Sequence, residues 1–149
     1  MLATGWIALR HTNAMRFLDT NVLLYAISTA PDEVAKRAVA QSLLDAEDWV
    51  LSVQVLQEFY VQATRVTKPE RIQHEQAAAL IEAWLRFKIQ EITVPIVQAA
   101  LEAKVRFQLS YWDAAIIEAA RAAGCRQIYS EDLNAGQDYA GIRVINPFV

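Results

Sequence analysis

The sequence predicts one α/β domain with a mainly parallel sheet. Short runs of β-branched and aromatic residues alternate along the chain with longer stretches of helical periodicity, the pattern of a sheet whose strands are joined by helices. Hydrophobic residues make up 54% of the 149 residues and charged residues 21%, which is enough apolar surface for one core. Four Gly and four Pro are too few for long linkers, so we expect no domain boundary after residue 15.

Five strands are expected where apolar runs are short and lack helical spacing. The run WVLS is the clearest, and it ends in Ser52, a residue suited to capping the helix that follows. The expected strands are 17–18, 49–52, 90–94, 127–130 and a last one in 142–149 that ends before Pro147.

Helices are expected between these strands. The helix after Ser52 carries Leu56, Phe59, Tyr60 and Ala63 at the spacing of a core-facing stripe. The other expected helices are a short one through 23–26, one over 33–47, one from Pro69, one with Pro95 in its first turn that runs to about Phe107, and one over 110–123 that Gly124 stops.

Residues 1–14 are expected to form an N-terminal extension outside the fold, with Met15 as an alternative start. Their apolar stretch, Gly5 to Leu9, is shorter than the core of a signal peptide, and no run in the chain approaches the ~18 residues of a membrane span. The single Cys125 excludes an intrachain disulfide framework, suits a reducing cytosol and is interpreted as a small buried residue. We therefore expect a cytoplasmic protein with no membrane segment.

The net charge of −3 restricts the classes of nucleic-acid protein that the chain can be. A module that binds nucleic acid through phosphate contacts alone is usually basic. Acidic side chains and an anionic substrate are reconciled when a metal ion lies between them. The charge therefore argues against a simple DNA-binding module and leaves a metal-dependent nuclease open.

Four acids fall near one edge of the predicted sheet. Asp19 follows the first strand, Glu58 lies in the helix after WVLS, Asp113 begins a helix, and Asp132 follows the strand QIYS. Ligands bind beyond the carboxyl ends of parallel strands, and carboxylates gathered there repel one another unless a cation neutralises them. Oxygen ligands suit Mg²⁺ or Mn²⁺, whereas Zn²⁺ favours His and Cys, and neither His11 nor His74 has a partner at ligand spacing.

Each acid also has a purely structural interpretation. Asp19 could cap the helix that follows it, and Asp113 stands three residues after Ser110 in a formal capping box. Glu58 could be a solvated acid on a helix flank, and Asp132 could be an ordinary turn residue. Their joint placement at one sheet edge favours a common site.

The sequence resembles a known family along nearly its whole length, from Met15 to Phe148. The motifs FLDTNVLLYA, VLQEFY, LSYWDAAIIEAA and IYSEDLNAGQDYAGIRVINPF resemble, in this order, the PIN-domain toxins of the VapC type. The resemblance implies that 15–149 is a PIN domain with an α/β/α sandwich. It further implies a Mg²⁺- or Mn²⁺-dependent endoribonuclease, the toxin of a toxin–antitoxin pair, which binds a cognate antitoxin and forms a homodimer.

The resemblance assigns roles residue by residue. The four metal-binding, catalytic acids match Asp19, Glu58, Asp113 and Asp132, and the small polar positions beside the metal match Thr20, Asn21 and Ser130.

Two further acids depart from this pattern. Glu131 stands next to Asp132, and the spacing from Ser130 favours Asp132 as the inward acid. Glu118 lies five residues after Asp113, about 140° round an ideal helix, so we expect it at the surface or behind the site.

Bases and aromatic residues supply candidates for binding surfaces. Arg65, Lys68 and Arg71 cluster in RVTKPER and could contact RNA, although a solvated turn is the alternative. An aromatic surplus fits an interface, although most of its members are expected in the core; they are Trp49, Tyr60, Trp84, Phe87 and Trp112.

Two rival functions remain. One is a metal-dependent phosphatase with Asp19 as nucleophile, but enzymes of the haloacid-dehalogenase kind usually carry a second acid where this chain has Asn21. The other is a catalytically silent binding module of the same fold, which the loss of an acid would indicate; all four acids are present.

Overall fold

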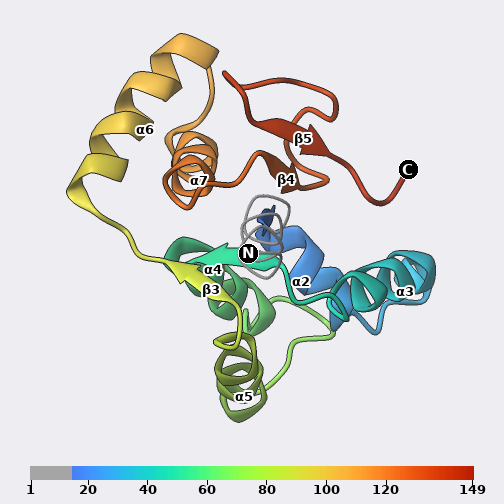
Figure 1. Cartoon of the computed structure of the whole chain (residues 1–149). Coiled ribbons are helices and arrows are strands. Elements are labelled where there is room, and N and C mark those ends of the chain that lie inside the picture. The colour runs from blue at the N-terminus through green and yellow to red at the C-terminus, as the bar shows by residue number, and fades with distance from the viewer. Residues whose placement is uncertain (1–14) are drawn as a thin grey trace, which may run out of the picture.

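A single parallel sheet forms the centre of the molecule (Figure 1). The computed structural model describes residues 15–149, so the predicted extension 1–14 lies outside the described residues. Within residues 15–149 the sheet has the strand order β3-β2-β1-β4-β5, and every neighbouring pair is parallel. The strands are β1 (Arg16–Leu18), β2 (Trp49–Ser52), β3 (Lys88–Gln90), β4 (Gln127–Tyr129) and β5 (Arg143–Ile145).

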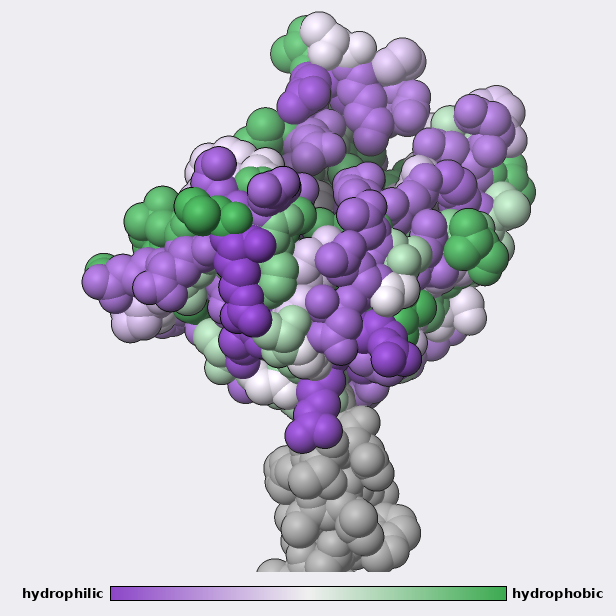
Figure 2. Space-filling view, turned by 90° about the horizontal axis from the view of Figure 1, so that it is seen from above, coloured by the Kyte–Doolittle hydropathy of each residue, from purple (hydrophilic) through white to green (hydrophobic). Residues whose placement is uncertain are grey.

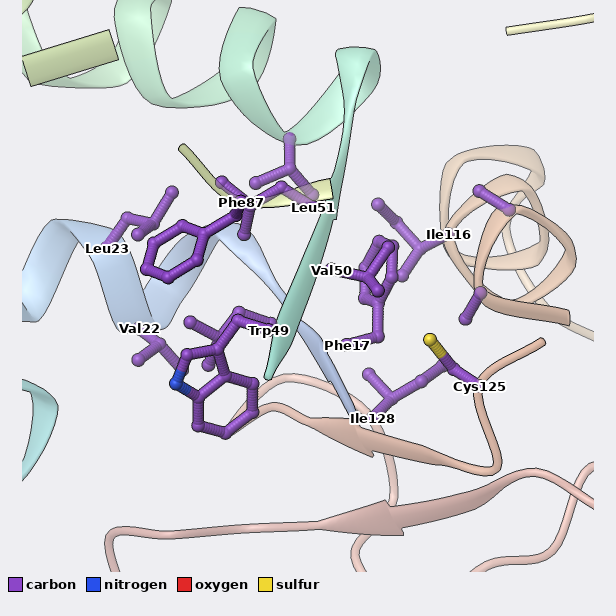
Figure 3. Packing of buried hydrophobic residues seen from close by; sticks show 14 of the residues in the cluster. Phe17, Val22, Leu23, Trp49, Val50, Leu51, Phe87, Ile116, Cys125 and Ile128 are labelled. Carbon is purple, nitrogen blue, oxygen red and sulfur yellow. The ribbon is translucent and has the colours of Figure 1, made fainter. Parts of the chain in front are cut away.

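Helices cover both faces of the sheet, which confirms the predicted α/β/α architecture. Helices α2 and α4 lie on one face, α7 lies on the other, and α6 packs along α7 (Figures 1 and 3). The helices are α2 (Thr20–Ala26), α3 (Val34–Leu43), α4 (Val53–Ala63), α5 (His74–Trp84), α6 (Val94–Phe107) and α7 (Tyr111–Ala122), with a 3₁₀ turn, η1 (Pro31–Glu33), before α3.

The alternation of side chains along β2 builds the core on both sides of the sheet. Val50 points toward Ile116 of α7, whereas Trp49 and Leu51 point to the opposite face, where α2 lies (Figure 3). All four side chains are buried, and full burial of a side chain of this size stabilises the fold by about 1.5–3 kcal/mol. Cys125 is buried in the same core, as predicted.

The predicted helix over 33–47 is too long. Helix α3 ends at Leu43, whose carbonyl oxygen accepts a hydrogen bond of 2.6 Å from the indole N–H of Trp49. A side chain of β2 therefore supplies the hydrogen-bond donor for a carbonyl group at the C-terminal end of α3. The chain then turns toward β2.

Two further boundaries differ from the prediction because of helix caps. The helix predicted from Pro69 begins at His74, where Gln73 and Gln76 form a capping box, and the predicted helical start lies in a loop. The strand predicted over 90–94 ends at Gln90, because Thr93 caps α6: its Oγ1 accepts from Ile96 N–H at 3.3 Å.

The surface is mixed in character. On the face shown in Figure 2 hydrophilic residues predominate and hydrophobic residues form small groups among them. Of the aromatic residues considered for an interface, Trp49, Trp84 and Phe87 are buried, Tyr60 is half-buried, and Trp112 is 64% exposed. No helix within residues 15–149 combines the length and the apolar composition needed to cross a membrane.

Candidate active site

Asp19 lies at the carboxyl end of the central strand β1 and also caps α2. Its backbone is extended, and its Oδ1 accepts a hydrogen bond of 2.8 Å from the N–H of Thr20. The capping role expected as an alternative is therefore real, but it uses only one carboxylate oxygen. The side chain is buried, so the second oxygen needs a partner inside the protein.

Ser130, which follows β4, supplies that partner. Its hydroxyl donates to Asp19 Oδ2 at 2.8 Å and accepts from the N–H groups of Asp132 and Leu133 at 3.1 and 3.3 Å. The side chain is fully buried. Ser130 thus joins the ends of the neighbouring strands β1 and β4 and turns the chain so that Asp132 comes next to Asp19.

Asn21 completes the link between these two acids. Its Nδ2 lies 3.4 Å from Asp19 Oδ2, 3.3 Å from Asp132 Oδ2 and 3.1 Å from Ser130 Oγ, and its Oδ1 accepts from the N–H of Glu131 at 3.1 Å. One buried amide therefore holds both carboxylates and the loop after β4 in place.

Glu58 is tied to the same cluster from α4. Thr20 Oγ1 donates to Glu58 Oε2 at 2.8 Å, and Gln54 Nε2 donates to Glu58 Oε1, also at 2.8 Å. Two side-chain hydrogen bonds on a half-buried carboxylate do not fit a freely solvated acid on a helix flank. Because Thr20 follows Asp19 directly, Glu58 lies on the same side of the sheet edge.

Asp113 occupies the first turn of α7. Ser110 Oγ accepts from the Asp113 N–H at 3.1 Å, which is half of the predicted capping box. Among the described residues no hydrogen bond returns from the Ser110 N–H to the Asp113 carboxylate. The predicted capping box is therefore only half formed.

The electrostatics show that the acids share one environment. Burial raises the pKa of Asp19 to about 7, hydrogen bonds from Ser130 and the Thr20 N–H oppose this rise, and repulsion from Asp132 and Glu58 adds to it. The pKa of Asp113 is also raised, first by burial and further by the charges of Asp132 and Glu58.

Within residues 15–149 no ion pair offsets this repulsion. None of the four acids belongs to an ion pair within the described part of the chain, where the ion pairs are Arg16–Asp48, Lys36–Glu131 and Arg121–Glu118. The pKa values of Asp19 and Asp113 are raised first by burial and further by the charges of Glu58 and Asp132, and a cation bound between these carboxylates would relieve that repulsion.

A divalent cation fits the chemistry of this donor set. Asp19 offers buried carboxylate oxygens, while Glu58 and Asp113 are half-buried and Asp132 is exposed. Within residues 15–149, however, no three Asp, Glu, His or Cys side chains stand close enough together to form a ready-made metal cluster. The arrangement suits an ion that keeps several waters, as Mg²⁺ does, better than an ion enclosed by protein ligands.

The two acids outside the expected set point elsewhere. Glu131 forms an ion pair of 2.7 Å with Lys36, so Asp132 is the acid of this pair that faces Asp19 through Asn21. Glu118 is buried and pairs with Arg121 at 3.0 Å, so of the two positions expected for it, at the surface or behind the site, the surface position is wrong.

The three predicted RNA-binding bases lie in the loop between α4 and α5, where backbone hydrogen bonds join Arg65 to Lys68 and Lys68 to Arg71. Arg65 lines a groove of about 430 Å³ together with Glu58 and Trp112, whereas Lys68 and Arg71 do not line it. Of the three bases, Arg65 is therefore the one that shares a groove with a candidate acid.

Three residues near the site were not predicted from the sequence. Gln54 holds Glu58 and also donates to the Trp112 carbonyl at 3.2 Å; its position four residues before Glu58 on one helix was an available signal. Trp112 is exposed beside Asp113. The buried Tyr139 has its pKa raised by burial and by the charge of Asp113, a contact between distant segments that no local pattern marks.

The fold of the chain is similar to that of a solved toxin and of a chain in a solved toxin–antitoxin complex. VapC20 of Mycobacterium tuberculosis, described as a toxin that cleaves the sarcin–ricin loop, is 22% identical, with a TM-score of 0.63 over 78% of this chain and 89% of that chain. A toxin–antitoxin complex from Klebsiella pneumoniae contains a chain 21% identical, with a TM-score of 0.65 over 89% of this chain and 97% of that one.

A third structure is VapBC2 from Rickettsia felis bound to a fragment of its promoter DNA. Its matching chain is 18% identical, with a TM-score of 0.61 over 87% of this chain and 96% of that one. At these identities the likeness shows the fold alone.

Among curated proteins the comparison gave no match. The model of the PIN domain family matches residues 16–137, which include all four acids and most of the described chain. The chain therefore belongs to the PIN domain family.

Proposed function

We propose that this protein is an endoribonuclease that depends on Mg²⁺ or Mn²⁺ and acts as the toxin of a toxin–antitoxin pair. The observation that carries the proposal is the buried Asp19, which Ser130 and Asn21 connect to Asp132 while Thr20 connects its loop to Glu58. The raised pKa of Asp19, about 7, supports a cation in this network. The PIN domain match supports a nuclease.

In this proposal the four acids bind the metal ion, and their polar neighbours hold the acids in position. Asp19, Glu58, Asp113 and Asp132 would hold the divalent ion, which lowers the pKa of a bound water and neutralises charge on the phosphodiester. Ser130, Asn21 and Thr20 fix the carboxylates by the hydrogen bonds described above, so that the acids need not reorganise when the ion binds. Arg65, in the adjoining groove, would bind a neighbouring phosphate.

The proposed partners are a cognate antitoxin and a second copy of the chain, in the cytoplasm. The Klebsiella and Rickettsia structures, a toxin–antitoxin complex and VapBC2 on promoter DNA, support the first. Exposed hydrophobic residues on α6, namely Val94, Leu101 and Val105, fit a protein interface. Sedimentation that shows only monomer at micromolar concentration would contradict the dimer.

The activity is tested by incubating purified protein with RNA in Mg²⁺, in Mn²⁺ and in EDTA. Cleavage should require a metal, and Asp19→Asn and Asp113→Asn should each reduce it by more than about 100-fold, beyond the usual effect of losing a residue that only positions a ligand. Glu131→Gln is the matched control, because that acid points to Lys36, and it should cleave normally.

Two outcomes would refute the assignment. Full activity of Asp19→Asn would show that the reaction does not use the site. Release of phosphate from p-nitrophenyl phosphate without RNA cleavage would assign the site to a phosphatase.

A further inference from the structure

A groove beside Glu58 is not used by the metal chemistry proposed above. It lies between α4 and the start of α7 and has a volume of about 430 Å³, within the usual range of small-molecule sites. Besides Glu58 it is lined by Gln54, Gln57, Val61, Gln62, Arg65 and Trp112. The groove therefore begins at one of the candidate ligands and continues away from the cluster of acids.

Trp112 is the most unusual residue of this groove. Its side chain is 64% exposed although Trp49 and Trp84 are buried, so its indole adds little to the core. Its backbone is held by the bond from Gln54, and its ring meets that of Tyr111 edge to face, with centroids 5.1 Å apart. A large aromatic face is thus held at the surface, one residue before Asp113.

The other side chains supply hydrogen-bonding groups and one cation. Among the described residues the amides of Gln57 and Gln62 have no hydrogen-bond partner in the protein, and Arg65 has no ion pair. A glutamine amide offers a donor and an acceptor, as the edge of a nucleobase does, and a guanidinium matches phosphate. An indole is a stacking surface for any base.

We propose that this groove binds one unpaired nucleobase of the RNA next to the scissile phosphate, with Trp112 as the stacking platform. The inference rests on the proposed ribonuclease function and assigns it a substrate subsite. Gln57 and Gln62 face the edge of the base, and Arg65 contacts the following phosphate. Arg65 lines the groove that begins at Glu58, so the phosphate that follows the bound base meets a guanidinium rather than the repelling carboxylates.

The test measures binding separately from cleavage. Fluorescein-labelled six-nucleotide RNAs, each of a single base, are titrated with wild type, Trp112→Ala and Trp112→Phe in Ca²⁺ buffer, and cleavage of unlabelled RNA is followed in Mg²⁺. Leu85→Ala, which truncates an exposed residue outside the groove lining, is the control.

Trp112→Ala should weaken RNA binding by roughly 5- to 150-fold, the range for losing one stacked base. Trp112→Phe should retain most of the affinity, and Leu85→Ala should bind as wild type. RNA should also quench the tryptophan fluorescence of wild type, and the difference spectrum against Trp112→Phe should assign that change to Trp112. Gln62→Ala should alter the order of preference among the four RNAs.

The outcomes separate this inference from the proposed function. If wild type cleaves RNA and Trp112→Ala binds and cleaves equally well, the nucleobase site is refuted while the ribonuclease stands, and the groove serves another occupant such as a protein segment. If Trp112 is quenched and required for binding but no RNA is cut with any metal, the nucleobase site stands and the proposed function fails. If wild type neither binds nor cleaves RNA, both fail.

Discussion

Replacing Asp19 by Asn removes a charge that the fold buries at a cost. In the absence of metal, the pKa of Asp19 is about 7 in the folded protein against an ordinary value of 3.8, first because of burial. Between these two values the folded state holds a proton that the unfolded state has released. The free energy of unfolding of the wild type therefore falls as pH rises through this window.

The size of this pH-dependent change in stability follows from the pKa shift of Asp19. Each pKa unit corresponds to about 1.4 kcal/mol, so the ionisation of Asp19 lowers stability by about 1.6 kcal/mol at pH 5 and about 4 kcal/mol at pH 8. Asn does not titrate, and it keeps an acceptor for the Thr20 N–H and a group that can bond to Ser130. The stability of Asp19→Asn relative to wild type should therefore rise by about 2–3 kcal/mol between pH 5 and pH 8.

Urea unfolding in EDTA at several pH values between 5 and 8, followed by circular dichroism, measures this difference. Asp48→Asn is the control, because the pKa of Asp48 is shifted in the opposite direction to that of Asp19. The hydrogen bonds from Arg16 lower the pKa of Asp48, so its contribution is complete above its ordinary pKa and is lost only as pH falls through the lowered one. Asp48→Asn should thus be destabilised by a constant amount from pH 5 to pH 8. If the difference in the free energy of unfolding between Asp19→Asn and wild type did not change with pH, the inference that Asp19 is a buried carboxylate without a compensating charge would be refuted.

Three further substitutions test the surroundings of the site. Ser130→Ala should destabilise the protein by about 1–3 kcal/mol because it removes the 2.8 Å donor to Asp19 Oδ2 and leaves that oxygen only the longer contact from Asn21, and it should extend the pH-dependent loss of stability to higher pH in the same urea experiments. Glu131→Gln should cost less than about 1 kcal/mol and leave RNA cleavage unchanged, whereas Asp132→Asn should abolish cleavage; the reverse result would exchange their roles. Arg65→Ala should weaken RNA binding and reduce the slope of log affinity against log salt by about 0.7 to 1, and an unchanged slope would remove this residue from the phosphate contacts.

The sequence predicts the layout of the fold and the gathering of the acids because both follow from local patterns. The run WVLS is the strand β2 at the predicted bounds, and Ser52 caps α4 as expected, with its Oγ accepting from Val55 N–H at 3.3 Å. The acids Asp19 and Asp132 come together because the carboxyl ends of neighbouring parallel strands share one edge. The start of one helix was predicted at Pro69, whereas the capping box of Gln73 and Gln76 sets that start at His74.

Partners that come from distant segments could not be predicted. The spacing from Ser130 favoured Asp132 as the inward acid, but it did not show that Glu131 pairs with Lys36, 95 residues away in the chain. Glu118 is buried because Arg121 both pairs with it and donates to the carbonyl of Tyr139, 18 residues further on. Only a folded chain shows these partners, so sequence patterns alone placed both acids incompletely.

The central claim is that the four acids hold a divalent cation, and calorimetric titration with Mn²⁺ tests it most directly. Wild type should bind Mn²⁺ and, because the pKa of Asp19 is about 7, release about half a proton per ion at pH 7, as measured in buffers of different ionisation enthalpy. Asp19→Asn and Asp132→Asn should lose at least about ten-fold in affinity and Asp19→Asn should lose the proton release, while Glu131→Gln should bind as wild type. Equal Mn²⁺ binding by wild type and Asp19→Asn would contradict the account.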